Sequence, residues 1–268
     1  MQCKGHLSRL VPAALSAIII ATFTGCSGSP TTLIAMAAGG AKPAMDDIGS
    51  RWNQEFEPQL IVSYGGGGEL LQQMQYGRVG DIFIAPEQAF MDMAVSHNLI
   101  DAETIVNVAY MIPAIAVARG NPHSIHSLAD LAIPGLRIAM TRPETTLLGR
   151  LAPEIFKRAG LSEAINTNIT AYASDPNNLM YLIATGNIDA GITWHFYQSY
   201  DDKLEIIFLE PDQVTGIGEM LAAVNSASSN KDDAARFIDF LISEAGQAIF
   251  QQHGYITDHK EVSKYWNR

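Results

Sequence analysis

The chain has 268 residues, of which 47% are hydrophobic and 17% are charged, and its formal net charge is −11. This is ordinary globular composition, and it argues against collagen, coiled coil and a largely disordered chain. The acidic balance, without any basic stripe, disfavours nucleic-acid binding, which needs positive charge along the phosphate backbone. Two cysteines are too few for a disulfide framework or a multi-thiolate metal site.

The N-terminal segment is predicted to direct secretion rather than to belong to the fold. Two basic residues precede an apolar run over 10–23, which is short for a membrane span but suits the core of a signal peptide. The run leads to Cys26 in a context that resembles a bacterial lipoprotein signal, in which the Cys becomes the lipidated N-terminus. We expect a signal peptide over 1–25, a linker over 26–31 and an extracytoplasmic protein tethered to a membrane through Cys26. The alternative is an ordinary signal peptide with an incidental Cys.

After this segment, strand-like apolar runs alternate with segments of helical period. In the first part of the chain, strands are predicted over 33–37, 60–64 and 81–85. Each run is followed by Gly or Pro and then by a predicted helix, and Pro86 is predicted to open its helix because Pro is favoured at a first helical position. Three such units in succession predict an α/β fold with a largely parallel sheet.

A long β-prone stretch over 105–118 is predicted to cross from this first lobe to a second. The second lobe is expected to repeat the pattern, and 220–224 is expected to return the chain to the first lobe, where a strongly amphipathic helical region follows. The predicted second-lobe strands cover 136–140, 168–173 and 190–194, helices begin at 141–144 and at 174–176, and the C-terminal helical region covers 231–252. The expected lobes are 32–112 plus 220–268, and 113–219.

Several short motifs occur in a recognisable order along this pattern. They include Gly80-Asp81-Ile82-Phe83-Ile84, Gly120-Asn121-Pro122, Pro134-Gly135-Leu136-Arg137-Ile138-Ala139, Asp189-Ala190-Gly191-Ile192 and Gly254-Tyr255. In this order and spacing, the chain from about Leu33 to Tyr255 resembles the molybdate- and tungstate-binding proteins of bacterial ABC importers, a group of type II periplasmic solute-binding proteins. The resemblance implies a two-lobed α/β fold, each lobe a mixed, mostly parallel sheet flanked by helices. It also implies a monomer that closes on a small ligand by hinge motion and delivers it to an ABC permease.

The resemblance also assigns a pocket, and the chain departs from the family's pattern there. In the molybdate binders, two Ser hydroxyls, several backbone N–H groups and a Tyr hydroxyl hold the oxyanion. The two Ser positions fall on Gly40 and Gly67, two backbone donors fall on Pro86 and Pro176, which have no N–H, and the Tyr falls on Trp194. The expected ligand-binding residues are Gly40, Gly67, Pro86, Glu87, Pro176, Asn177 and Trp194.

Two accounts of the ligand remain open from the sequence. In the first, a tetrahedral oxyanion still binds, held by helix N-termini, by free N–H groups expected at Glu87, Gln88, Asn177 and Asn178, and by the Trp194 indole. In the second, the ligand is a metal cation or a small organic solute, because the usual donors are lost and acidic residues lie near the loops. The candidate metal ligands are Glu87, Glu144 and Asp175. These three acids also suit the first turns of helices for purely structural reasons.

No catalytic motif is legible in the sequence, and we expect neither enzyme activity nor a cofactor. The chain contains no Gly-x-Ser-x-Gly, no phosphate-binding Lys loop and no His-Glu-x-x-His. The hypotheses from other classes are a lipoprotein hydrolase, which would need a nucleophile with a paired base, and the binding subunit of a signalling system. The predicted function is therefore solute binding for an ABC importer.

Overall fold

The fold was analysed in a computed structural model that describes residues 32–77 and 79–267. The predicted signal peptide, linker and Cys26 lie outside the described residues. The first part of the fold comprises β1 (Thr32–Ala38), η1 (Gly39–Ala41), α1 (Lys42–Glu55), β2 (Gln59–Gly65), α2 (Gly67–Gly77), β3 (Ile82–Ala85), α3 (Gln88–Ser96), η2 (Ala102–Thr104) and β4 (Val106–Met111). The chain continues through β5 (Pro113–Ala118), η3 (Leu128–Ala132), β6 (Ile138–Thr141), α4 (Leu147–Arg158), α5 (Ser162–Asn166), β7 (Ile169–Ala173), α6 (Pro176–Ala184), β8 (Ala190–Trp194), η4 (His195–Ser199) and β9 (Leu204–Phe208). It ends with β10 (Gly218–Val224), α7 (Lys231–Ile242), α8 (Glu244–Gln252) and α9 (His259–Val262).

The strands form two five-stranded sheets with the same internal plan. The first sheet has the order β2-β1-β3-β10-β4, and the second has the order β7-β6-β8-β5-β9. In each sheet three strands are parallel and the last two pair antiparallel. In each sheet the fourth strand is the one that the chain reaches after leaving the other sheet. The α/β fold with two mixed sheets flanked by helices is the one predicted from the sequence.

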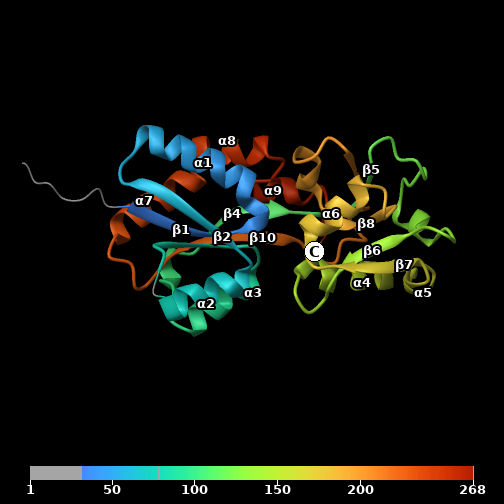
Figure 1. The fold of residues 1–268 in the computed structure, drawn as a ribbon, viewed down its shortest axis with the longest axis horizontal. Coiled ribbons are helices and arrows are strands. Elements are labelled where there is room, and N and C mark those ends of the chain that lie inside the picture. Colours follow the sequence, from blue (N-terminus) through green and yellow to red (C-terminus); the bar gives the residue numbers. More distant parts are fainter. Residues whose placement is uncertain (1–31, 78, 268) are drawn as a thin grey trace, which may run out of the picture. The chain divides into compact units, whose positions relative to one another are not determined.

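Helices bury both faces of the first sheet. Figure 1 shows α1, α7 and α8 on one side of it and α2 and α3 on the other. Met36 and Phe83 point toward α2 and α3, where they join Leu70 and Met91 in a separate apolar cluster. Trp52 of α1 lies on the other side against Phe237 of α7, with ring centroids 5.1 Å apart. Alternating side chains of the same strands thus serve two cores, as the period of two in a strand requires.

The predicted crossing over 105–118 consists of two strands that belong to different sheets. β4 lies in the first sheet and β5 in the second, and Ile112 alone separates them. The Ile112 N–H donates to His195 Nδ1 at 3.0 Å, and the His195 N–H donates back to the Ile112 carbonyl at 2.9 Å. A side chain of the second sheet's β8–η4 segment therefore fixes the residue at which the chain changes sheets.

Most predicted elements are present, and several differ from the sequence prediction. The helix predicted to begin at 141–144 begins at Leu147, because Thr146 caps it by accepting the Gly149 N–H at 3.0 Å. Pro86 does not open α3; Glu87 is the N-cap and the helix begins at Gln88. The C-terminal helical region is broken at Ser243, whose hydroxyl caps α8. The strand β9 was not predicted. The lobe boundaries stay a prediction, while the strands themselves divide between the sheets at Ile112 and again between β9 and β10.

Candidate functional site

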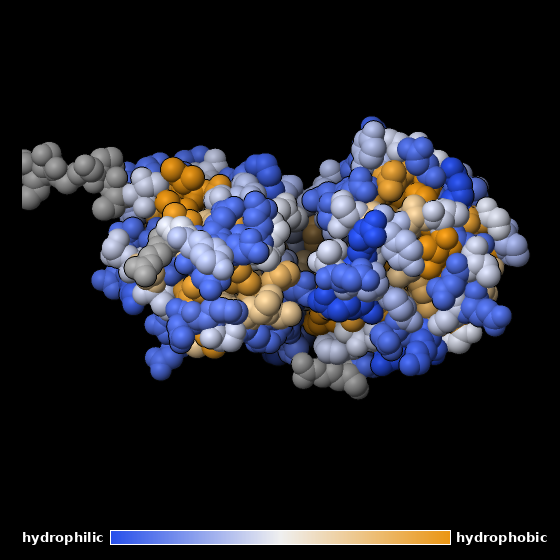
Figure 2. Space-filling view, turned by 60° about the horizontal axis from the view of Figure 1, so that its bottom comes forward, coloured by the Kyte–Doolittle hydropathy of each residue, from blue (hydrophilic) through white to orange (hydrophobic). Residues whose placement is uncertain are grey.

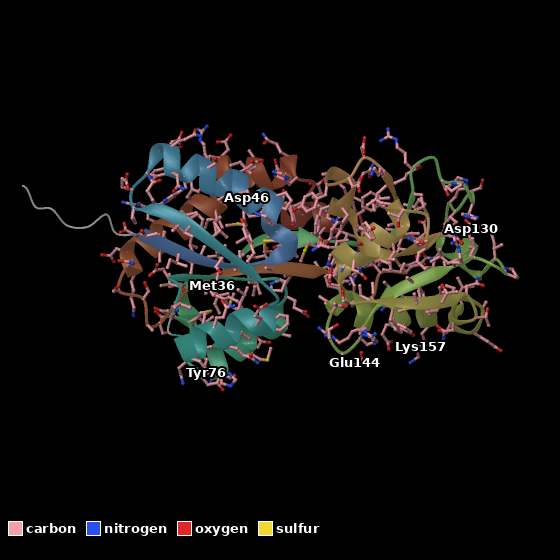
Figure 3. All side chains as sticks on the ribbon, viewed as in Figure 1. Met36, Asp46, Tyr76, Asp130, Glu144 and Lys157 are labelled. Atoms are coloured by element: carbon pink, nitrogen blue, oxygen red, sulfur yellow. The ribbon has the colours of Figure 1, made fainter. Side chains whose placement is uncertain are left out.

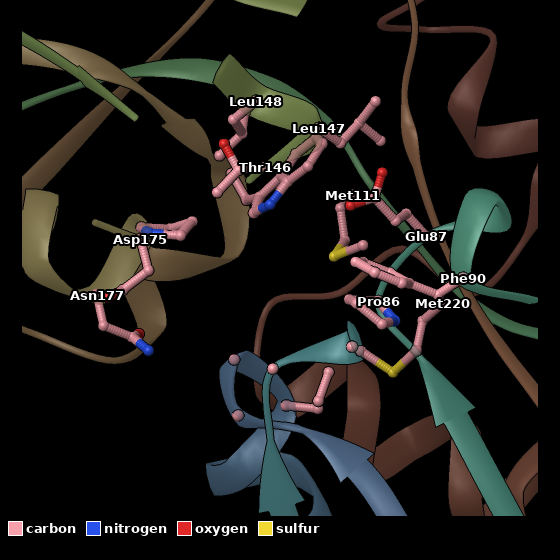
Figure 4. Close-up of a pocket in the computed structure, with 18 of the residues that line it drawn as sticks. Pro86, Glu87, Phe90, Met111, Thr146, Leu147, Leu148, Asp175, Asn177 and Met220 are labelled. Carbon is pink, nitrogen blue, oxygen red and sulfur yellow. The ribbon is translucent and has the colours of Figure 1, made fainter. Parts of the chain in front are cut away.

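A pocket of about 340 Å³ lies where the carboxyl ends of strands from both sheets meet. In Figure 2 the surface is hollowed between the two lobes, and hydrophobic residues are visible inside the hollow. Figure 4 shows Pro86, Phe90, Met111 and Met220 on one side of this pocket and Asp175 and Asn177 on another. Ligands of open α/β folds bind outside the carboxyl ends of strands, so this pocket is the candidate site.

The first two strands of the first sheet contribute mainly backbone to the pocket. β1 ends at Gly39-Gly40, and β2 ends at Gly65 before Gly66 and Gly67 lead into α2. The first intrahelical bond of α2 runs from the Leu70 N–H to the Gly66 carbonyl, so the N–H groups before Leu70 have no partner within the helix. These loops place free backbone donors, with no intervening side chain, at the wall of the pocket.

The second sheet presents helices that are already capped by their own side chains. Thr146 caps α4, and Asp175 caps α6 by accepting the Asn178 N–H at 3.0 Å. The expectation of a free N–H at Asn178 is therefore wrong, whereas no intrahelical partner exists for the N–H of Asn177 in the first turn. Trp194 closes β8, lines the pocket and is 7% exposed. Its indole N–H has no hydrogen-bond partner among residues 32–77 and 79–267.

One ion pair joins the two lobes at the edge of the pocket. The Glu87 carboxylate, at the N-terminus of α3, accepts a hydrogen bond from the Arg150 guanidinium of α4. The Leu147 N–H, in the first turn of α4, also stabilises the ionised carboxylate. Burial nevertheless raises the pKa of Glu87 above its ordinary value, because desolvation of the charge outweighs the opposing effect of Arg150. The negative charge of Glu87 is thus tied to the second lobe rather than free to bind a cation.

Stacked aromatic rings form a further wall. The Phe196 ring stacks on Tyr197 at 4.6 Å and on Tyr255 at 4.3 Å between centroids. The Tyr197 hydroxyl donates to Asn177 Oδ1 at 2.9 Å, and the Tyr255 hydroxyl donates to the Gly40 carbonyl at 3.2 Å. Burial raises the pKa of both phenols, so both stay protonated at physiological pH. Gly40, the position of a family Ser, is therefore held in place by a Tyr from the end of the chain.

The structure brings the seven residues named from the sequence to this single pocket. Gly40, Gly67, Pro86, Glu87, Pro176, Asn177 and Trp194 all line it. The three candidate metal ligands are not brought together. Asp175 lines the pocket but caps α6, whereas Glu144 is exposed on the loop before α4 and does not line the pocket (Figure 3). Among the described residues, no group of three His, Cys, Asp or Glu is arranged to hold a metal ion.

Sequence reasoning missed several lining residues. Phe90 lies in the first turn of α3, three residues after its N-cap Glu87, and the sequence already placed the start of this helix at the pocket. Thr146 was missed because α4 was predicted to start too early. Met220 and Tyr255 reach the pocket from distant parts of the chain, and nothing in their local sequence indicates this. Arg150 carries no local signal either, since its role depends on Glu87 in the other lobe.

Comparison with known proteins identifies the family. The model of the bacterial extracellular solute-binding proteins matches residues 33–256. The molybdate-binding protein ModA of Mycobacterium tuberculosis is 25% identical over 90% of this chain and 95% of its own length. ModA of Escherichia coli is 23% identical over 93% of this chain and 97% of its own. The periplasmic molybdate-binding protein of Azotobacter vinelandii superposes with a TM-score of 0.71 at 15% identity, over 85% of this chain and all of that one.

The chain therefore belongs to the bacterial extracellular solute-binding proteins. This confirms the resemblance inferred from the ordered motifs and the two-lobed fold expected with it. The relatives are named as binding proteins rather than as enzymes. Within the part of the chain that the structure describes, no helix is long and apolar enough to cross a bilayer.

Proposed function

We infer that this protein is the extracytoplasmic binding component of an ABC importer and that it holds a small oxyanion in the pocket between its lobes. Family membership and the molybdate-binding relatives support the solute-binding role. As part of the same proposal, lipid on Cys26 tethers the chain to a membrane, and lobes 32–112 plus 220–268 and 113–219 close on the ligand.

The observation that supports oxyanion binding is that three helix N-termini converge on one pocket. α2 from the first lobe and α6 from the second begin at lining residues, Gly67 and Pro176, and α3 begins directly after the lining residue Glu87. Each is at least nine residues long, and each N-terminus carries unpaired N–H groups and a partial positive charge. Such N-termini bind anions without Lys or Arg, which explains how a chain of net charge −11 can do so.

The two carboxylates of the pocket favour an anionic ligand over a cationic one, because both already accept hydrogen bonds from other groups of the protein. Glu87 is paired with Arg150 and held at the first turn of α4. Asp175 accepts the Ser174 hydroxyl at 2.6 Å and the Asn178 N–H. A cation would have to displace these partners, whereas an anion would meet free N–H groups and the Trp194 indole.

Closure of the two lobes follows from the positions of the residues that would contact the ligand. A ligand that contacts first-lobe N–H groups together with Asn177 and Trp194 is bound by both lobes only when they are close together. Ligand binding therefore shifts the population toward the closed state in proportion to those added contacts. The short connection at Ile112, held by His195, is the natural hinge, because there the chain changes sheets within one residue.

Titration calorimetry of the purified protein tests the proposal. Molybdate, tungstate, sulfate, phosphate and a set of divalent cations are each titrated at constant ionic strength. We expect saturable binding of an oxyanion at one site per chain, and a loss of roughly tenfold in affinity for Trp194→Phe, which removes the N–H and keeps an aromatic ring. Saturable binding of a cation with none of any anion would overturn the proposal.

A further inference from the structure

The side chains that face the pocket are mostly apolar, unlike those expected around an inorganic oxyanion. Its polar groups are backbone N–H groups, Glu87, Asp175, Asn177 and a few hydroxyls. Much of the remaining wall consists of Phe90, Met111, Leu147, Trp194, Phe196 and Met220. Figure 4 shows Phe90, Met111 and Met220 grouped at the first-lobe side, next to Pro86. The pocket therefore has a donor-rich part and an apolar part.

The position of one family Ser is closed to any side chain. A Cβ atom placed on Gly67 would lie 2.5 Å from Phe90 Cδ2 and 2.7 Å from Phe90 Cε2. The Phe90 ring, on the first turn of α3, thus occupies the space that a side chain at position 67 would need. At position 67, where the resemblance places a Ser, the chain thus presents an apolar surface rather than a hydroxyl or empty space.

An inorganic tetrahedral oxyanion fits such a wall poorly. Its oxygens point in all directions, and each one that faces Phe90 or a Met loses its hydration without gaining a hydrogen bond. An unpaired polar group in an apolar environment carries a large free-energy cost. A ligand that is anionic at one end and apolar at the other avoids this cost, because its charged group faces the helix N-termini while its body covers the rings.

We propose that the ligand is a small organic anion, with one carboxylate, phosphate or phosphonate head and a compact apolar body that contacts Phe90. This proposal rests on the proposed function, since it assigns a substrate class to the same pocket. The volume of about 340 Å³ agrees with it, because pockets for small organic ligands begin at roughly 300 Å³. The head lies at the N-termini of α2, α3 and α6, and Phe90 determines the specificity for the body.

A homologous series of ligands separates head from body. Inorganic phosphate and methyl-, n-propyl- and phenylphosphonate share one head group, and molybdate serves as the inorganic reference. We expect affinity to rise about fourfold for each buried methylene, and phenylphosphonate to bind more tightly than both inorganic ions. Phe90→Ala should flatten this series. Tyr76→Ala, at a ring that is 81% exposed and does not line the pocket, is the control variant and should leave the series unchanged.

The outcomes distinguish this inference from the function on which it rests. A flat series with molybdate as the tightest ligand would overturn the organic ligand and leave anion binding standing. Failure of every anion in the panel to bind would overturn both. A rising series that Phe90→Ala leaves as steep as before would overturn the role of Phe90. A rising series that Phe90→Ala flattens and Tyr76→Ala leaves unchanged supports the proposal.

Discussion

The two walls of the pocket come from sheets with the same strand plan, yet they are built from different chemical groups. On the first-lobe side, β1 and β2 end in glycines, and α3 begins without a side-chain cap. On the second-lobe side, Thr146 and Asp175 cap the two helices that begin there, and Trp194, Phe196 and Tyr197 line the pocket. Free backbone donors therefore belong mainly to the first lobe, whereas apolar and aromatic side chains come from both lobes.

This difference indicates which part of the ligand each lobe contacts. A repeated sheet order fixes where helices begin, but it does not fix whether their first N–H groups are free. Removal of side chains at Gly40 and Gly67 leaves the donors of the first lobe free for a ligand. The capped helices of the second lobe have fewer free donors and supply Trp194, Asn177 and the rings. We expect the first lobe to hold most of the charged head of the ligand, while Phe90 of the same lobe and the rings of the second lobe contact its body.

The largest expected effect is a loss of folding stability at acid pH. It involves His195, which holds Ile112 at the connection between the two sheets. Burial lowers the pKa of His195 from its ordinary value of 6.5 to about 4. Between these pH values the unfolded chain binds the proton and the folded chain does not. The contribution of His195 to the free energy of unfolding is therefore fully present above pH 6.5 and decreases as the pH falls. Below pH 4 the free energy of unfolding is lower by up to about 3 kcal/mol.

Chemical denaturation between pH 4 and 7.5 measures this dependence. His195→Asn keeps an acceptor for the Ile112 N–H but does not titrate, so its stability should change less steeply over the same range. Loss of the ring lowers its stability at neutral pH, which makes the slope rather than the absolute value the decisive quantity. If wild type and variant have parallel profiles, His195 does not set the acid sensitivity of the connection.

The next effect tests the first-lobe wall by adding a side chain at each glycine. Gly67→Ser brings Cβ within 2.5 Å of the Phe90 ring, and such overpacking costs about 1–3 kcal/mol. Gly40→Ser is the matched control, because its Cβ meets only the Tyr197 hydroxyl at 3.7 Å, and its cost should stay within about 0.5 kcal/mol. Thermal unfolding should place Gly67→Ser roughly 2–10 °C below wild type. Equal melting temperatures for the two variants would contradict the packing of Phe90 over Gly67.

The sequence was sufficient to predict the alternation of strands and helices, because burial of each strand and the amphipathic period of each helix are local properties. It also predicted that Gly40, Gly67, Pro86, Pro176 and Trp194 would face one pocket. The resemblance to the molybdate-binding family assigned these positions, and they lie at or just after the carboxyl ends of strands of both sheets. The helix that contains Arg150 was predicted to start at 141–144, which is too early, because Thr146 is its N-cap.

What the sequence could not supply depends on contacts between distant residues. The ring of Phe90 over Gly67, the pairing of Glu87 with Arg150 and the bond from Tyr255 to Gly40 each join separate elements. No local pattern distinguishes Glu87 as an ion-pair partner from Glu87 as a metal ligand. The same holds for Asp175, which suits a cap and a cation site equally well until its neighbours are known.

The smallest expected effect is a change in anion affinity when one carboxylate of the pocket is neutralised. It shows which carboxylate carries negative charge that no neighbouring cation compensates. Glu87→Gln and Asp175→Asn each remove one negative charge and keep the shape of the side chain, and Asn still caps a helix well. Glu87 is paired with Arg150, whereas Asp175 makes no ion pair among the described residues. Asp175→Asn should therefore strengthen binding of an anion by about two- to threefold, and Glu87→Gln by less than twofold.

Calorimetry with whichever anion binds wild type measures both changes, and repetition at 0.5 M salt provides the control, since screening should reduce the gain for the partly exposed Asp175. A larger gain in anion affinity for Glu87→Gln than for Asp175→Asn would mean that Arg150 does not neutralise Glu87. The uncompensated negative charge would then lie on the first-lobe side of the pocket. A loss of affinity in both variants would mean that the carboxylates contact a positively charged or hydrogen-donating part of the ligand. Because the two residues lie on opposite lobes, the order of their effects locates the ligand's charge between the walls.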